Sequence, residues 1–333
     1  MKTINVVQFG CGPVGCSIAG LAAGKKGISI VGAVDLNNAG RDLGELIGLG
    51  KSVGITVSES ADIILAQTRP DVVLHATGSV LQDVYPQLEQ IIKAKANIIS
   101  TCEELSYPFR KQPALAANLD KLAKQHNVTL LATGVNPGFL MDTWPIFMTG
   151  ICQDVKTIKA VRIQDASVRR IPFQKKIGAG KTINEFNILV KEGILRHVGL
   201  AESIGMIAAA MGWDLDDITE SIEPIIAESV EGSNYVKIKP GRVAGVKQIG
   251  FGIKNGTKLI ILEFKAFIGA KESFDAVYIT GKPDLQVMIK GGTHGDIATA
   301  AIVVNSIPRV LESPKGLLTM KDLAIVNAIP NNN

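Results

Sequence analysis

Residues 4–35 read INVVQFGCGPVGCSIAGLAAGKKGISIVGAVD, and this stretch decides the fold of the first half of the chain. The run of branched apolar residues at 4–9 predicts a buried strand of a parallel sheet. The glycines of GCGPVG follow at once in the spacing G-x-G-x-x-G. Small residues at 17–23 then favour a helix, and 28–34 predicts a second strand that ends at Asp35. Strand, glycine turn, helix, strand and acidic residue in this order predict a dinucleotide-binding βαβ unit.

Each part of this motif has a physical role in holding a dinucleotide. Gly10 permits a tight turn, Gly12 lets the backbone approach a pyrophosphate, and Gly15 lets the helix pack close to the strand. We expect the N-terminus of the following helix, with Pro13 and Val14, to face the phosphates. A tight turn without a ligand is the alternative interpretation.

Asp35 is the expected contact to the adenosine ribose. Its carboxylate can accept hydrogen bonds from the ribose hydroxyls, and it repels a 2′-phosphate, so the sequence favours NAD over NADP. Asn37 and Arg41 lie close in sequence and could still accommodate that phosphate. Use of NADP therefore stays open.

The uncharged stretch from Thr3 to Gly24 also resembles a signal peptide. Glycines and a proline interrupt its middle, however, where a signal needs an unbroken apolar segment, and the dinucleotide motif explains them better. The scattered cysteines, with no CxxC pair, favour free thiols in a reducing compartment. We therefore expect a cytoplasmic protein.

The alternation of strands and helices continues along the chain. Strands are predicted at 71–76, 97–101 and 128–132, with helices at 85–95 and 114–126 between them. This succession predicts a doubly wound sheet, in which ligands bind beyond the carboxyl ends of the strands. The expected site comprises residues 10–15, 35, 76–79, 101–104 and 134–138. The expected cofactor contacts beyond the first turn are Ala76, Thr77, Thr101 and Asn136.

After Phe139 the pattern changes to strand runs broken by glycine turns, which suggests an open mixed sheet with helices on one face. The predicted strands lie at 156–163, 235–239, 243–250, 258–268, 273–280 and 286–290, and the predicted helices at 184–196 and 200–211. An apolar helix at 296–311 is expected to pack back on the first domain. We thus expect an α/β chain. Residues 1–138 with 296–333 form a Rossmann domain, a doubly wound parallel sheet, and residues 139–295 form an α+β substrate-binding and dimerisation domain with an open mixed sheet.

Composition narrows the class of protein further. A length of 333 residues favours two domains. Hydrophobic residues make up 46% and the net charge is +4, so a disordered chain is excluded and nucleic acid is not expected as a partner. Four cysteines and four histidines show no metal-ligand spacing, so no metal site is expected. A membrane partner is not expected either.

Five segments resemble the dihydrodipicolinate-reductase-like amine dehydrogenases related to 2,4-diaminopentanoate dehydrogenase. They are VVQFGCGPVG, DVVLHATGS, NIISTCEELSYP, LLATGVNPGF and GDIATAAIVVNSIPRV, and they span almost the whole chain. The resemblance implies reductive amination of a ketone or aldehyde with ammonia and NAD(P)H, and the reverse deamination of an amine. It also implies a homodimer built through the second domain.

The resemblance further implies that the catalytic carboxylate lies in CEELSYP. Glu103 is our choice and Glu104 the alternative, because two adjacent acids leave the assignment open by one position. Adjacent residues in an extended segment point to opposite sides, so we expect only one of them to face the nicotinamide. A carboxylate there can hold ammonium, remove its proton, relay protons while the carbinolamine loses water, and stabilise the iminium cation. A closed apolar pocket is expected to raise the pKa of Glu103.

Other candidates are weighed against a packing role. Asn136 is expected to contact the nicotinamide carboxamide or ribose, with a self-bonded turn as the alternative. Asn305 is expected either to approach the cofactor or to cap and pack its helix. Arg162, Arg169 and Arg170 could hold a substrate carboxylate. The candidates for the substrate pocket are Phe139, Met141, Trp144, Phe173, His197 and Ile204.

Three competing functions stay open. Cys102 could act as the nucleophile of an acylating dehydrogenase, but the adjacent Glu103 and Glu104 raise the pKa of a thiol and favour a packing role. A dihydrodipicolinate-type reductase would need a His-rich basic segment that this sequence lacks. A non-catalytic NAD(H)-binding sensor would have no need of a carboxylate at the nicotinamide.

Overall fold

The computed structural model describes residues 3–332. The chain divides into two compact units, Met1–Phe139 with His294–Asn333, and Leu140–Thr293. The expected limits, 138 and 296, lie close to these boundaries. Within the described residues, no helix is both long and apolar enough to cross a membrane.

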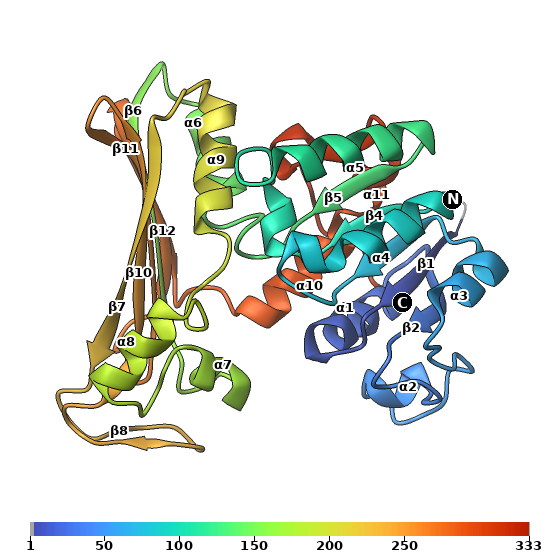
Figure 1. Ribbon diagram of the computed structural model, residues 1–333, viewed down its shortest axis with the longest axis horizontal. Helices are drawn as coiled ribbons and strands as arrows, with labels where there is room; N and C mark the ends of the chain where they lie inside the picture. Colours follow the sequence, from blue (N-terminus) through green and yellow to red (C-terminus); the bar gives the residue numbers. More distant parts are fainter. Residues whose placement is uncertain (1–2, 333) are drawn as a thin grey trace. The chain divides into compact units, whose positions relative to one another are not determined.

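A parallel sheet of six strands forms the centre of the first unit, in the order β14-β5-β4-β3-β1-β2 (Figure 1). Every neighbouring pair in it runs parallel, which confirms the predicted doubly wound sheet. Its strands are β1 (Ile4–Phe9), β2 (Ile28–Val34), β3 (Val72–His75), β4 (Asn97–Ser100), β5 (Thr129–Ala132) and β14 (Gly316–Leu318).

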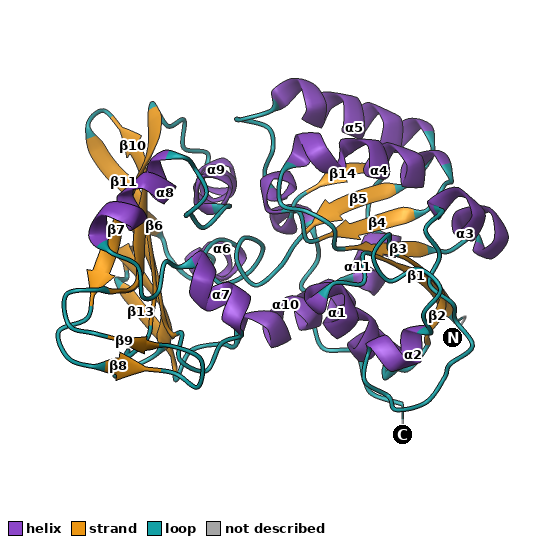
Figure 2. Cartoon of the chain, turned by 60° about the horizontal axis from the view of Figure 1, so that its bottom comes forward, coloured by secondary structure: helices purple, strands orange, loops and turns teal. Residues whose placement is uncertain are grey.

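Helices cover both faces of this sheet (Figure 2). They are α1 (Pro13–Ala23), α2 (Leu43–Leu46), α3 (Ala61–Thr68), α4 (Leu81–Lys93), α5 (Pro113–Gln125), α10 (Gly295–Asn305) and α11 (Ile307–Glu312), with the 3-10 helices η1 (Glu103–Ser106) and η2 (Met320–Asp322). On one face, Val73 and Ile98 of the sheet share a core with Leu65, Leu88 and Leu119 of α3, α4 and α5. On the other face, α1 packs against α10.

The late apolar helix is divided, although the sequence predicts one helix over 296–311. The first segment ends at Asn305, and Ser306 caps both this helix and the next. Pro308 stands in the first turn of α11. Proline has no N–H to continue a helix but suits a first turn, so the chain starts a new helix there.

The second unit is built on a mixed sheet in the order β13-β12-β6-β11-β10-β7. Only β11 and β6 pair in parallel among these neighbours, so the predicted open mixed sheet is confirmed. Its strands are β6 (Asp154–Asp165), β7 (Asp217–Ile226), β10 (Val243–Lys254), β11 (Thr257–Phe267), β12 (Phe274–Lys282) and β13 (Leu285–Lys290).

Helices of the second unit lie on one face of its sheet (Figure 1). They are α6 (Thr143–Thr149), α7 (Ile171–Lys176), α8 (Ile183–Lys191) and α9 (Leu200–Met211). The helix α9 packs on β10, where Gly250 and Gly252 leave room for Ile204: a Cβ on either glycine would stand within 3 Å of the Ile204 side chain.

One strand of this unit was missed, and one strand prediction was wrong. The sequence analysis did not foresee β7, whose Pro224 and acidic residues mask the strand pattern. Proline is tolerated there because β7 lies at the edge of the sheet. The predicted strand at 235–239 is reduced to β9 (Lys237–Ile238), which pairs with β8 (Glu231–Gly232) in a separate ribbon.

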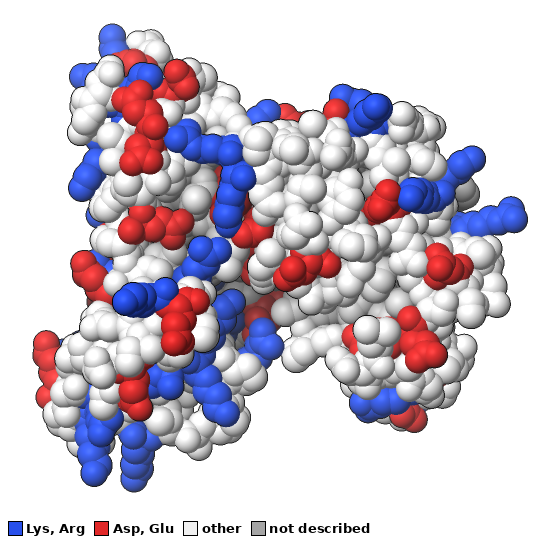
Figure 3. All heavy atoms as spheres, in the orientation of Figure 1, with Lys and Arg blue, Asp and Glu red and all other residues white. Residues whose placement is uncertain are grey.

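Charged side chains of both signs share the surface of the second unit (Figure 3). Lys247 and Glu223 pair at 3.1 Å, and Lys254 and Asp216 pair at 3.0 Å. Exposed pairs of this kind contribute about 0–1 kcal/mol each. Their main effect is to keep the local charge balanced, in line with the small net charge of +4.

Candidate active site

Backbone hydrogen bonds join the loops that follow neighbouring strands of the first sheet. Ala76 N donates to Phe9 O at 2.7 Å, and Thr101 N donates to His75 O at 2.9 Å, so the ladder continues beyond the strand ends. Ala76 and Thr101 are both half-buried at this edge. The structure thus brings the expected segments together at one carboxyl edge: 10–15, 76–79, 101–104 and 134–138.

The three glycines of the first loop have different reasons to be glycine. Gly10 has φ +90°, and a Cβ there would overlap the carbonyl group of Ala76. A Cβ on Gly15 would overlap the carbonyl oxygen of Gly10. A Cβ on Gly12 would meet no described atom within 4 Å. The fold therefore requires Gly10 and Gly15, whereas Gly12 borders open space that suits a pyrophosphate.

The N-terminus of α1 is suited to an anion. Gly12 is its N-cap and supplies no side chain to the first N–H groups, and Pro13 occupies the first turn. Pro13 is exposed and Val14 half-buried. No acidic residue stands in this turn, so the partial positive charge of the helix end is not neutralised by a side chain of α1.

The carboxylate of Asp35 joins the end of β2 to the glycine turn. Its Oδ2 accepts from Cys11 N at 2.7 Å, and its Oδ1 accepts from Asn37 N and Asn38 N, each at 2.9 Å. Although desolvation opposes it, these hydrogen bonds hold the pKa of Asp35 below its ordinary value. Arg41 lies beside this group, donating to Asn38 Oδ1 at 3.1 Å. The carboxylate is therefore ionised and fixed in direction.

A buried polar network, absent from the sequence analysis, lies under Thr77. His75 Nδ1 lies 2.9 Å from Ser100 Oγ, and His75 Nε2 lies 2.8 Å from Gln87 Oε1. Thr77 Oγ1 is 2.9 Å from His75 Nε2 and donates to Gln87 Oε1 at 2.6 Å. Burial lowers the pKa of His75 to about 4, so its ring is neutral near neutral pH. A polar residue ending an otherwise apolar strand was the signal available in the sequence.

The two adjacent glutamates have different surroundings. Glu104 is buried, and its carboxylate accepts from Leu81 N at 2.9 Å and from Gln112 Nε2 at 2.8 Å, and pairs with Lys111. These contacts tie η1 to the start of α4 and to the loop that follows η1. Glu103 is half-buried at the first position of η1. Glu104 thus has a structural task, which is to hold η1 against the start of α4.

The expectation of an extended backbone at 103–104 was wrong. Both residues belong to the 3-10 helix η1, in which Leu105 N donates to Cys102 O at 3.2 Å. Successive side chains in such a helix still diverge, at about three residues per turn. The two carboxylates therefore point in different directions because of the helical turn and not because of an extended backbone.

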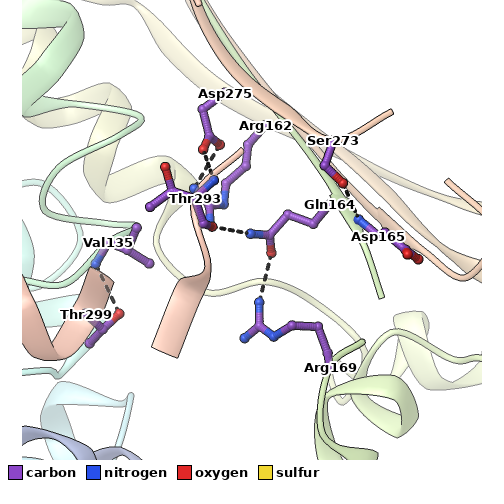
Figure 4. A network of polar contacts seen from close by, with 9 residues as sticks. All are labelled: Val135, Arg162, Gln164, Asp165, Arg169, Ser273, Asp275, Thr293 and Thr299. Atoms are coloured by element: carbon purple, nitrogen blue, oxygen red, sulfur yellow. Dashed lines mark hydrogen bonds and ion pairs between the residues drawn. The ribbon is translucent and has the colours of Figure 1, made fainter. Parts of the chain in front are cut away.

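The loop after β5 is held firmly in place. Gly138 has φ +125°, a conformation that favours glycine. Val135 N donates to Thr299 Oγ1 of α10 at 3.2 Å (Figure 4). Asn136 lies between these points and is only 9% exposed. The direction of Asn136 is therefore fixed by the loop.

Asn305 and Phe139 were also candidates for the site. The side chain of Asn305 accepts from Ile329 N at 3.0 Å and thereby holds the C-terminal segment. Phe139, the last residue of the first unit before the boundary, is 36% exposed. The structure gives Asn305 a packing and anchoring role.

The apolar candidates of the second unit differ in burial. Met141 is 1% exposed and Ile204 is fully buried, and Ile204 packs α9 on β10. Trp144 on α6 is half-buried. Phe173 is half-buried beneath the guanidinium of Arg169, whose Cζ lies 4.3 Å from the ring centroid. Ile204 is a core residue, and Phe173 is the candidate with a polar neighbour.

His197 lies on the sheet of the second unit. Its ring stacks on Phe264 at 4.7 Å between centroids, and its backbone N and O bond the side chain of Gln248 at 2.7 and 2.9 Å. Burial, with smaller effects of the cations Lys176 and Arg162, lowers the pKa of His197 to about 3. The ring is therefore neutral near neutral pH.

A charged network is buried on the same sheet (Figure 4). Arg162, 1% exposed, donates to Asp275 at 2.8 Å and to Thr293 O at 2.7 Å. Gln164 donates to Thr293 O at 3.0 Å and accepts from Arg169 at 3.2 Å. Arg162 and Arg169 are close enough that each disfavours the charge of the other. The network holds two guanidinium groups in fixed directions.

The cysteines are all unpaired thiols. Cys102 is 1% exposed, and burial raises its pKa to about 12, so the packing role is the one that the structure supports. Residues 3–332 contain no group of three or more side chains arranged to bind a metal ion.

Relatives of the chain have amine dehydrogenase names. The family model of the 2,4-diaminopentanoate dehydrogenase C-terminal domain matches residues 139–333. A 2,4-diaminopentanoate dehydrogenase of Acetoanaerobium sticklandii is 36% identical over 338 residues, which cover 99% of this chain and 96% of that protein. An amine dehydrogenase of Streptomyces virginiae is 24% identical, with 98% of each chain covered. Among solved structures, an amine dehydrogenase from Mycobacterium smegmatis has a TM-score of 0.85 at 26% identity, with 97% of each chain covered.

Proposed function

This chain belongs to the 2,4-diaminopentanoate dehydrogenase family, and we propose that it catalyses the reductive amination of a ketone or aldehyde with ammonia, and the reverse oxidative deamination. Membership makes it an oxidoreductase that acts on CH–NH2 groups with a nicotinamide cofactor. The alternatives of a dihydrodipicolinate-type reductase and a non-catalytic sensor are set aside on that ground. The observation that carries the proposal is Glu103, half-buried at the same sheet edge as the open glycine turn.

We assign the proton transfers to Glu103. In the amination direction its carboxylate takes a proton from ammonium, which frees the nitrogen lone pair to attack the carbonyl carbon. A proton moves from the nitrogen of the resulting adduct to its oxygen, which forms the carbinolamine. The protonated carboxyl group then gives its own proton to the hydroxyl, which departs as water and leaves the iminium cation. The carboxylate that results stabilises the iminium cation. When bound, the nicotinamide supplies the hydride that reduces the iminium carbon.

The contacts of Glu104 support a positioning role for that residue. Its carboxylate is buried and engaged by Leu81 N, Lys111 and Gln112. We assign the reaction to Glu103, which is half-buried at the first position of η1.

Binding of the cofactor falls to the carboxyl edge of the first sheet. Gly12 borders the space for the pyrophosphate, and the N-terminus of α1 offers its N–H groups. Asp35 Oδ2 accepts one hydrogen bond, from Cys11 N, and so retains capacity for a ribose hydroxyl. We propose that NAD is preferred over NADP, which the ratio of kcat/KM for NADH and NADPH will test. A higher kcat/KM for NADPH would indicate that Arg41 binds the 2′-phosphate.

We propose that the substrate is a small amino or oxo acid, as the name of the Acetoanaerobium relative suggests. Arg169 is held by Gln164 and stacks on Phe173, which leaves its planar group fixed in direction. Guanidinium groups bind carboxylates in two parallel hydrogen bonds. Arg169→Met is expected to raise the KM for a 4-oxo-2-amino acid about 10- to 100-fold and to leave cyclohexanone nearly unchanged. Equal losses for both carbonyls would contradict this assignment.

We also propose a homodimer formed through the outer face of the second sheet. Phe251 and Ile261 stand opposite each other on β10 and β11, so they share one face. Ile249 follows on the same face, and Met288 on β13 is 40% exposed. Ile261→Glu is expected to convert the dimer to a monomer in analytical ultracentrifugation. A wild-type monomer at micromolar concentration would refute the proposal.

The four free thiols support a cytoplasmic location, which we propose for the protein. Fractionation of its natural host with a specific antibody tests this assignment. Recovery in an extracellular or periplasmic fraction would contradict it.

Oxidation of NADH with a small carbonyl panel tests the activity. Cyclohexanone, a short aldehyde and a 4-oxo-2-amino acid are each assayed with and without concentrated ammonium at alkaline pH. We expect oxidation that depends on ammonium. Oxidation without ammonium would indicate a carbonyl reductase and remove the role given to Glu103, and tight NADH binding without any oxidation would restore the sensor interpretation.

A further inference from the structure

We propose that His75 is a positioning residue that sets the place of Glu103 through Ser100, and this inference rests on the proposed role of Glu103. His75 ends β3 and Ser100 ends β4, and the two residues stand opposite each other in the parallel ladder. Both are fully buried. Their side chains therefore meet directly under the loops that carry Thr77 and Glu103.

The hydrogen bonds of this network assign the proton of the His75 ring. Gln87 Oε1 accepts from the Thr77 hydroxyl and is also the partner of His75 Nε2 at 2.8 Å, so Nε2 carries the ring proton. His75 Nδ1 then accepts from the Ser100 hydroxyl at 2.9 Å. Ser100 Oγ in turn accepts from Cys102 N at 3.1 Å. A continuous path thus runs from Thr77 to the backbone of Cys102.

The two ends of this path are both next to the candidate chemistry. Cys102 is the residue before Glu103 and forms the N-cap of η1, so its N–H direction sets how η1 begins. At the other end, a Cβ on Gly10 would stand 3.0 Å from the Thr77 methyl group, which places Thr77 against the glycine turn. The network links the cofactor loop to the loop of Glu103.

We expect that breaking this network lowers the turnover rate. A misplacement of about 1 Å at a reacting group can cost about 100-fold in rate. Without the His75–Ser100 bond the Ser100 hydroxyl can rotate, which weakens its hydrogen bond from Cys102 N and lets η1 shift. The rest of the dinucleotide contacts, at Gly12 and Asp35, lie outside the network, so cofactor affinity should change little.

Two isosteric variants separate this role from simple packing. An Asn side chain reproduces the position of His Nδ1, and a Gln side chain reproduces that of Nε2. His75→Asn keeps the bond to Ser100, and His75→Gln keeps the bond to Gln87. We expect kcat of His75→Gln to fall about 10- to 100-fold, with NADH affinity within about 3-fold of wild type. His75→Asn should stay within about 3-fold of wild type in both quantities, and Ser100→Ala should match His75→Gln.

A second readout does not depend on turnover. Amide hydrogen exchange at Cys102 should accelerate in His75→Gln and Ser100→Ala but not in His75→Asn. Equal losses of kcat in both His75 variants, or unchanged exchange in Ser100→Ala, would overturn the inference. If wild-type protein shows no ammonium-dependent turnover, the proposed function fails by itself, and exchange at Cys102 still decides whether the network positions η1. In the Glu103→Gln background, His75→Gln should add no further loss of turnover, whereas additive losses would contradict a common path.

Discussion

The two sheets bury polar side chains in opposite ways. At the edge of the first sheet, the buried groups are neutral: His75 and Ser100 bond each other, and burial keeps the imidazole uncharged. The second sheet also buries charged groups, since Arg162 pairs with Asp275. Burial lowers the pKa of Arg162 to about 10 and raises the pKa of Asp275 despite their attraction. Desolvation thus outweighs the pairing in the second sheet, and a buried charge pair is weak evidence for stability.

The two networks have different consequences, each within its own unit. The neutral network stands between loops whose positions matter for proton transfer. The charged network fixes Arg169 through Gln164, which suits recognition of an anionic group. Each of the tests below would change a different part of this comparison.

The largest effect is expected at the first sheet. Glu103→Gln keeps the size of the side chain but removes the acid–base function, which typically contributes about 100- to 10,000-fold. We expect kcat to fall at least about 1,000-fold, with the Kd for NADH within about 2-fold of wild type. Steady-state kinetics and fluorescence titration with NADH measure these two quantities.

Glu104→Gln is the matched control for this prediction. It loses the ion pair with Lys111 and should lower the free energy of unfolding by about 1–3 kcal/mol, while kcat falls less than about 10-fold. The reverse outcome, an active Glu103→Gln and an inactive Glu104→Gln, would move the reaction to the neighbouring carboxylate.

The next largest effect tests the charged pair. Arg162→Leu leaves the carboxylate of Asp275 buried without its cation, which should lower the free energy of unfolding by about 3–5 kcal/mol. The double variant Arg162→Leu, Asp275→Asn removes both charges and keeps an oxygen for Thr293 N. It should recover most of that loss in urea unfolding. A double variant as unstable as the single one would show that the pair stabilises the sheet.

A smaller effect separates two glycines of one loop. A Cβ at Gly15 would overlap Gly10 O, so Gly15→Ala should lower the free energy of unfolding by about 1–3 kcal/mol. Gly12→Ala meets no described atom and should change it by less than about 1 kcal/mol. Its methyl group would instead occupy the pyrophosphate space and raise the Kd for NADH about 10- to 100-fold. Unchanged NADH binding in Gly12→Ala would argue that this turn does not hold the cofactor.

Features that depend on residues close together in the chain could be predicted from the sequence. The parallel sheet and the open mixed sheet followed from strand runs and glycine turns. Gly15 of the glycine motif meets its constraint at the nearby Gly10, whereas Gly10 meets its own at the distant Ala76.

The role of a side chain could not be predicted from the sequence where it depends on residues far away in the chain. The structural role of Glu104 depends on Leu81 and Gln112, whose positions relative to η1 no spacing rule gives. The His75 network likewise depends on Ser100, 25 residues away in the chain, and on the register that sets β4 beside β3. Residues that meet only across a sheet leave no periodic signal in the chain.

The smallest expected effect is the pH dependence of stability, to which one buried histidine at each sheet contributes. Burial lowers the pKa of His75 to about 4, against about 6.5 in an unfolded chain. Between these values the unfolded chain binds a proton at this residue and the folded chain does not, so stability rises with pH in this window. The slope from His75 is at most about 1.4 kcal/mol per pH unit, and the contribution is lost as pH falls from about 6.5 towards 4. His197, whose ring stacks on Phe264 of the second sheet, acts in the same direction, because burial and neighbouring cations lower its pKa to about 3.

Urea unfolding at pH 7 and pH 5 measures this dependence. His75→Asn removes one of the two titrating groups, so the loss of stability between these pH values should shrink but not vanish. His197→Phe should remove the other part, and the double variant should be flatter than either single variant. If His75→Asn leaves the slope unchanged, His75 is not buried as a neutral ring, and the contrast between a neutral first network and a charged second one would no longer hold.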